Sequence, residues 1–120
     1  MLPEDPIADE LEKRMKAGGP LRDVLKWAES AYDKEMNRAY RAALAALPAS
    51  QRALLQASQR EWVQFRDREF ALMNSLFSSL RQTISLDTPE QLAWLQDRVN
   101  LVKERALNLR KYKTNPYRIG

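Results

Sequence analysis

Six polar or aromatic side chains between residues 33 and 66 stand at helical spacing and are the best suited of the chain to binding chemistry. They are Asp33, Asn37 and Tyr40 at i, i+4 and i+7, then Gln59, Trp62 and Arg66 at i, i+3 and i+7. Each triplet shares one side of its helix. If the chain reverses near Pro48 and Ala49, position i faces about position 99 minus i. This register places Asp33 opposite Arg66, Asn37 opposite Trp62, and Tyr40 opposite Gln59.

This polar seam has two interpretations. A carboxylate, amides and a guanidinium gathered in one place can bind a ligand. They can also satisfy one another and set the register of a helical hairpin, and we take this structural interpretation first. Replacing Arg66 by Ala should then lower the melting temperature, with a cost of about 3–5 kcal/mol if the pair is buried and far less if it is exposed. For Tyr40, Trp62 and Phe65 we expect core positions rather than a binding platform.

Catalytic constellations are missing from the sequence. Asp67 and Glu69 are two residues apart on a predicted helix, so they point to different faces and do not form a general acid–base pair. The chain has no histidine and no cysteine. It also has no glycine-rich phosphate loop, nucleophile elbow or metal-ligand spacing. We therefore predict a protein that is not an enzyme, with no cofactor and no metal site.

The elements that must position the seam are helical. Apolar residues recur every three or four positions, which predicts helices over residues 6–17, from 20 to about 47, from about 50 to as far as 85, and from 89 to about 112. Weaker helix formers allow a kink over 74–79. Pro48 ends the second helix, and Thr88 and Pro89 are an N-cap and first-turn proline for the fourth. Asn37 and Asp33 lie mid-helix, where such residues need a partner.

The expected architecture is all-α, an antiparallel bundle of three long helices plus a short N-terminal helix. The second and third helices should pack side by side, with the fourth laid along their groove. We divide the chain into an N-terminal arm (1–19), a helical domain (20–112) and a C-terminal tail (113–120). No run of residues is apolar over the roughly 20 positions that a membrane span needs.

Charge is unevenly placed along this chain of net charge +4. Residues 1–17 carry a net −2 and residues 103–120 a net +5. The basic end offers a set of candidate anion contacts: Lys103, Arg105, Arg110, Lys111, Lys113 and Arg118. Its other interpretation, which we favour, is a helix end whose cations complement the macrodipole, followed by a solvated tail.

The central stretch resembles the LprI-type lysozyme-inhibitor family, once catalogued as a domain of unknown function. The resemblance rests on the pattern D-x-x-[LM]-N-x-x-Y followed by L-x-x-x-Q-x-x-W-x-x-F-R-D. Its residues here are Asp33, Met36, Asn37, Tyr40, Leu55, Gln59, Trp62, Phe65, Arg66 and Asp67. Arg105 and Leu109 resemble the family's closing helix. The likeness covers roughly residues 20–110.

The resemblance implies an exported bacterial protein with disulfides, and this chain departs from it at two positions. Trp27 and Phe70 stand where the family usually has cysteines. In the antiparallel register these former disulfide positions lie close together. We expect an aromatic contact there in place of the crosslink, with a smaller contribution to stability.

The function implied by the resemblance is non-enzymatic binding of another protein in the bacterial envelope, with a lysozyme as the candidate partner. Animal lysozymes are generally basic, so an acidic patch should face the partner, and Glu4, Asp5, Asp9, Glu10 and Glu12 are the candidates. Two alternatives are a basic module binding nucleic acid or a membrane surface, and a structural or assembly role. We do not expect nucleic acid as the partner. The start of the sequence has no apolar signal segment, which predicts a periplasmic or secreted protein if a signal peptide was trimmed and a cytoplasmic one otherwise.

Overall fold

The computed structural model describes residues 5–80 and 88–117 and confirms the all-α class. Over those residues the chain forms four helices: α1 (Pro6–Lys16), α2 (Leu21–Ala46), α3 (Ala49–Leu80) and α4 (Pro89–Tyr112). α3 runs without interruption to Leu80, so the weaker helix formers over 74–79 do not break it. The predicted extension over 81–85 lies outside the described residues.

Helix ends follow the predicted local chemistry. The Thr88 hydroxyl accepts a hydrogen bond from the Gln91 N–H at 3.2 Å, and Pro89 occupies the first turn of α4. At α1, a carboxylate oxygen of Asp5 accepts from the Ala8 N–H at 3.1 Å. α2 ends where Leu47 becomes extended before Pro48, as expected for a residue that precedes proline.

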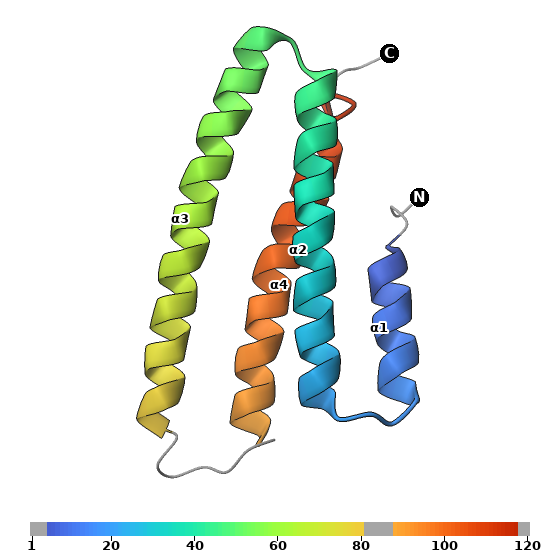
Figure 1. The fold of residues 1–120 in the computed structure, drawn as a ribbon, viewed down its shortest axis with the longest axis vertical. Helices are drawn as coiled ribbons and strands as arrows, with labels where there is room; N and C mark the ends of the chain where they lie inside the picture. The colour runs from blue at the N-terminus through green and yellow to red at the C-terminus, as the bar shows by residue number, and fades with distance from the viewer. Residues whose placement is uncertain (1–4, 81–87, 118–120) are drawn as a thin grey trace.

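The four helices run alternately along one long axis (Figure 1). α2 and α3 are antiparallel, and α4 returns between them and behind α2, parallel to α2 and antiparallel to α3. α1 lies along the opposite side of α2 from α3. Within the described residues no helix is both long and apolar enough to cross a membrane.

The core lies between α2 and α4. The largest fully buried side chains are Tyr32, Met36, Val99, Val102 and Leu109. Between them stand buried alanines, which let the two backbones come close: Ala28, Ala39 and Ala43 on α2 and Ala106 on α4. The tightest helix pair of the molecule is therefore one that is distant in sequence.

The expected side-by-side packing of α2 and α3 is wrong for most of their length. α2 packs mainly on α4, and α3 packs on α4 rather than on α2. Only Leu55 and Gln59 of α3 are buried. The physical reason is the type of side chain between the helices: α3 turns long polar residues such as Arg66 toward α2, and these hold two helices farther apart than alanines do.

Phe65 also departs from its expected place. It is 48% exposed, whereas Trp62 and Tyr40 are half-buried and pack against the core. Phe65 lies three residues beyond Trp62, which turns it about 60° round the helix. Because α4 reaches only one flank of α3, this turn leaves Phe65 exposed while Trp62 packs against the core. The prediction of core positions holds for Trp62 and Tyr40 and is wrong for Phe65.

α1 is attached to the core through a small number of contacts. Ile7 and Leu11 pack against the core, whereas Met15 is 44% exposed. The buried Tyr32 hydroxyl donates a hydrogen bond to Asp5 at 2.9 Å. Burial and this bond to a carboxylate raise the pKa of Tyr32 above its usual range. The arm therefore docks through the residue that also caps α1.

Candidate functional site

A polar groove opens between α2 and α3, with α4 as its floor. Its lining residues are Glu29, Ser30 and Asp33 from α2, Arg66, Asp67 and Phe70 from α3, and Val102 from α4. The groove encloses about 390 Å³.

Arg66 is the centre of this groove. Its Nη1 lies 3.5 Å from Oδ1 of Asp33 across the groove, which is the predicted pair. On its own helix, its Nε and Nη2 donate to Oδ1 of Asp67 at 3.1 and 3.0 Å. The guanidinium also lies 5.5 Å from the Trp62 ring centroid, within cation–π range. Arg66 thus holds two carboxylates, one from each wall.

The two carboxylates beside Arg66 face solvent. The side chain of Asp33 is 46% exposed and that of Asp67 is 64% exposed, whereas that of Arg66 is 20% exposed. The negative charges are therefore nearer to solvent than the positive charge that pairs with them. An arrangement of this kind can accept a cationic side chain from outside.

Arg98 of α4 contacts two of the residues that line the groove, Glu29 and Phe70. It binds Glu29 in bidentate fashion, with Nε to Oε1 at 2.6 Å and Nη2 to Oε2 at 3.2 Å. Its guanidinium lies 3.9 Å from the Phe70 ring centroid. Sequence reasoning missed Arg98 and Glu29. Glu29 lies four residues before Asp33, so it shares the same side of α2, and this spacing was the available signal.

The rest of the predicted seam is divided among other contacts. Gln59 is buried and accepts a hydrogen bond from Arg105 Nε at 2.9 Å. Asn37 is exposed. The register is therefore correct for Asp33 and Arg66, and α4 takes over the polar contacts of Gln59.

Trp27 and Phe70 do not replace a crosslink with an aromatic contact. Arg14 of α1 lies 4.1 Å from the Trp27 ring centroid, whereas Phe70 lies beneath Arg98 of α4. Among the described residues the aromatic pair is a different one, Phe77 with Trp94, at 4.7 Å between ring centroids. The expected contact is wrong because each ring contacts an arginine instead: Arg14 of α1 at Trp27, and Arg98 of α4 at Phe70.

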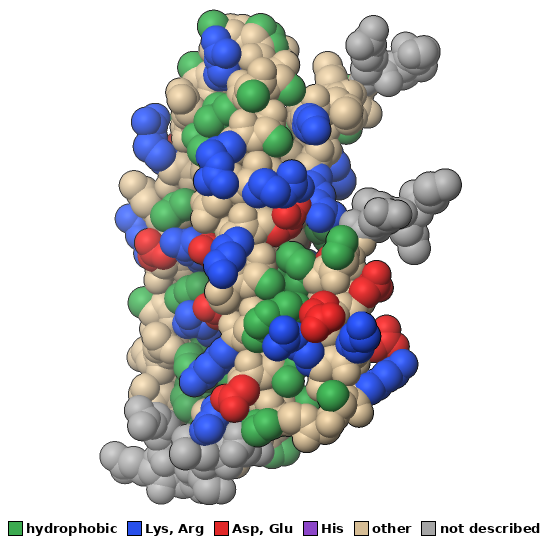
Figure 2. All heavy atoms as spheres, turned by 45° about the vertical axis from the view of Figure 1, so that its right-hand side comes forward, with side chains coloured by type: hydrophobic (Ala, Val, Ile, Leu, Met, Phe, Trp, Pro, Cys, Tyr) green, Lys and Arg blue, Asp and Glu red, His purple; other side chains and the backbone are tan. Residues whose placement is uncertain are grey.

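The candidate anion contacts do not form one surface. Arg105 is buried, where it also reaches Ser58 at 3.2 Å, and burial lowers the pKa of its guanidinium. Arg110 pairs with Glu35 at 2.8 Å, and Lys103 lies 3.8 Å from Asp5. Lys111 and Lys113 are exposed, and Arg118 lies outside the described residues. Figure 2 shows positive and negative side chains interspersed on the face that it presents.

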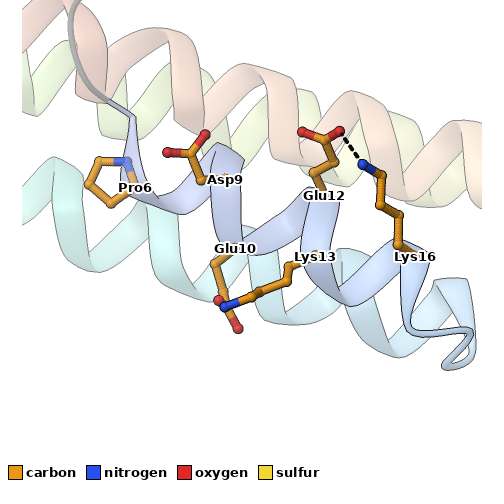
Figure 3. A pocket seen from close by; sticks show the side chains of 6 residues that line it. All are labelled: Pro6, Asp9, Glu10, Glu12, Lys13 and Lys16. Atoms are coloured by element: carbon orange, nitrogen blue, oxygen red, sulfur yellow. Dashed lines mark ion pairs between the residues drawn. The ribbon is translucent and has the colours of Figure 1, made fainter.

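The acids of the N-terminal arm are largely paired within α1. Glu10 binds Arg14 at 3.1 Å and Glu12 binds Lys16 at 3.0 Å. Figure 3 shows Glu12 and Lys16 turned toward each other along α1. Both residues line an open hollow of about 380 Å³. The carboxylate of Asp5 accepts a hydrogen bond from the Tyr32 hydroxyl. Glu4 lies outside the described residues. These two ion pairs leave the net charge of the arm unchanged, but they place a cation beside Glu10 and beside Glu12 and so weaken the negative field of α1.

Comparison with known proteins identifies the family. The sequence matches "Lysozyme inhibitor LprI" over residues 12–109, which span α2 and α3 in full and α4 nearly to its end. Neither a curated protein nor a solved structure matches the chain. No group of three or more acidic side chains within the described residues could hold a metal ion. The chain belongs to the LprI lysozyme-inhibitor family.

Proposed function

We propose that this protein binds and inhibits a lysozyme in the bacterial envelope. The observation that carries the proposal is the family match over most of the chain. The fold is consistent with a binding protein, because Arg66, Arg98 and Arg105 are held in contacts between helices and so make a firm framework for a binding surface. Inhibition then requires a surface that recognises the enzyme.

We infer that the groove between α2 and α3 is that surface. A basic lysozyme is repelled at long range by a chain of net charge +4, so its approach needs a local negative region. The groove provides one, because Asp33 and Asp67 are the solvent-facing charges on its two walls. A lysine or arginine of the enzyme would lie between these carboxylates and above Arg66.

The groove is preferred to the N-terminal arm for an electrostatic reason. On α1, Glu10 and Glu12 each have a cation one turn away, which cancels most of their field in solution. In the groove, Arg66 is shared between two carboxylates and is less exposed than either. The net charge that a partner meets there is negative.

The test is inhibition of a basic lysozyme on bacterial cell walls by the purified protein. Neutralising both carboxylates in Asp33→Asn, Asp67→Asn should weaken inhibition about 2- to 30-fold, since each exposed ion pair contributes about 0.2–1 kcal/mol. The loss should be larger at low salt. The matched control is Asp9→Asn, Glu12→Gln on α1, which changes the net charge equally and should leave inhibition within about twofold.

Three outcomes would count against the proposal. A protein that leaves lysozyme fully active contradicts inhibition itself. Loss of inhibition in the α1 variant, but not in the groove variant, moves the contact to the arm. Tight, strongly salt-dependent binding to nucleic acid without any effect on lysozyme would favour the basic-module alternative.

A further inference from the structure

α3 leaves a row of large apolar side chains in contact with solvent. Leu54, Phe65, Leu72 and Leu76 are 71%, 48%, 52% and 60% exposed. At 100° per residue these four positions fall within about 40° of one another round the helix. We call them the apolar stripe. α3 is an outer helix of the molecule (Figure 1), so the stripe is not covered by its neighbours.

The stripe is separate from the groove. Leu55 and Gln59, the two buried residues of α3, lie about 100° and 140° round the helix from Leu54. The stripe extends over about 33 Å along the axis, the rise of 22 residues. Scattered apolar side chains on a surface are normal, but an aligned row of this length is typical of an interaction surface.

We propose that a second copy of this chain covers the apolar stripe, with the two α3 helices packed antiparallel about a two-fold axis near Phe65. In this arrangement position i of one copy faces about position 130 minus i of the other. Leu54 then meets Leu76 of the second copy, and the two Phe65 rings meet at the axis. Leu72 lies opposite the small Ser58. Large side chains thus face either each other or a small residue, as helix packing requires.

The charges within the stripe select this arrangement. Glu61 and Arg68 are exposed. They lie about 20° and 40° round the helix from Leu54, on the same side of α3 as the stripe. In the antiparallel register, Glu61 of each copy lies within one residue of Arg68 of the other copy and on the same flank of the contact, so two reciprocal ion pairs form. A parallel pairing would place Glu61 against Glu61 and Arg68 against Arg68. These two charges therefore favour the two-fold antiparallel orientation over the in-register parallel one.

The contact predicts a weak and reversible dimer. One face of one helix buries less than the roughly 800 Å² per partner of a standard interface. Association should accordingly depend on concentration in the micromolar range and above. It should also weaken with salt, because Glu61 and Arg68 lie at the surface.

Sedimentation equilibrium of the full chain, from about 5 to 500 µM, tests the proposal. The average mass should rise from 14.0 kDa toward twice that value. Leu72→Asp places one unpaired carboxylate in each half of the contact, so this variant should remain monomeric throughout. Because Leu72 is exposed, this variant should keep the helical content of the parent.

Charge reversal provides the sharper test. Glu61→Arg alone and Arg68→Glu alone should each weaken dimerisation at least tenfold, because each places like charges opposite each other. The double variant Glu61→Arg, Arg68→Glu should restore it, since the exchange is reciprocal. Lys34→Glu, an exposed reversal on α2, changes the net charge as Arg68→Glu does and should have no effect.

The proposal is overturned by a constant monomer mass across the concentration range. It is also overturned if the double variant does not recover association, because the antiparallel register requires that recovery. If the parent is monomeric at every concentration and Leu72→Asp loses lysozyme inhibition, the apolar stripe contacts the enzyme and not a second copy. Helical content measured for every variant separates these results from misfolding.

Discussion

Nη1 of Arg66 on α3 lies 3.5 Å from Oδ1 of Asp33 on α2, across a groove whose floor belongs to α4. The pair joins two helices that do not otherwise pack closely. Because the Asp33 side chain is 46% exposed, water screens the attraction. The same exposure leaves the carboxylate available to a partner.

Replacing Arg66 by Ala should therefore lower the free energy of unfolding only slightly. An exposed pair contributes about 0.2–1 kcal/mol, which places the effect at the small end of the range expected from sequence. A double-mutant cycle with Asp33→Ala, followed by urea denaturation, measures the coupling. A coupling energy of 3 kcal/mol or more would show instead that the pair behaves as a buried one.

Arg105→Ala should destabilise the fold more than Arg66→Ala. Arg105 is 8% exposed and donates to the buried Gln59, whose side-chain oxygen would lose its partner. Leaving a buried acceptor unpaired costs about 1–3 kcal/mol. Urea denaturation measures the loss, and the exposed Lys111→Ala is the control, expected within about 0.5 kcal/mol of the parent. Equal effects of the two variants would contradict the buried role of Arg105.

Acidification should remove a contribution of Glu35 to stability. Its carboxylate accepts from Arg38 and also from Arg110, and these bonds hold the pKa of Glu35 below its ordinary 4.5. A carboxyl whose pKa is lower in the folded state stabilises the fold above its unfolded pKa, and this contribution is lost as pH falls through the folded pKa. Unfolding free energies measured between pH 7 and about pH 3 should fall less steeply in Glu35→Gln. Identical slopes for parent and variant would refute this.

Phe77→Ala should loosen the far end of α3. The Phe77 ring stacks on Trp94 of α4 at 4.7 Å with an interplanar angle of 8°, and the residues of α3 that are buried lie much nearer its start. Hydrogen exchange should accelerate over residues 71–80 and stay unchanged in α2. Leu72→Ala is the control, because Leu72 is 52% exposed and makes no such stack. Unchanged exchange in Phe77→Ala would mean that α3 is held by other contacts.

The helices and their ends follow from local chemistry that the sequence displays. Pro48 marks the turn after α2, and Thr88 with Pro89 marks the start of α4. The position of that turn also places Asp33 opposite Arg66, because an antiparallel register depends only on where the chain reverses. The family pattern could be recognised from the same stretch.

The tertiary structure alone decided which helices pack together. Helical periodicity identifies the apolar side of a helix but not the element that covers it. Phe65 and Leu72 belong to the same recurring apolar pattern as Leu55 but lie about 80–100° round the helix from it, and α4 reaches only the flank that carries Leu55. Arg105 belongs to a basic run in sequence, yet it is buried beside Gln59. In both cases the deciding quantity is the distance between elements that are far apart along the chain, and small buried alanines bring α2 to α4 rather than to α3.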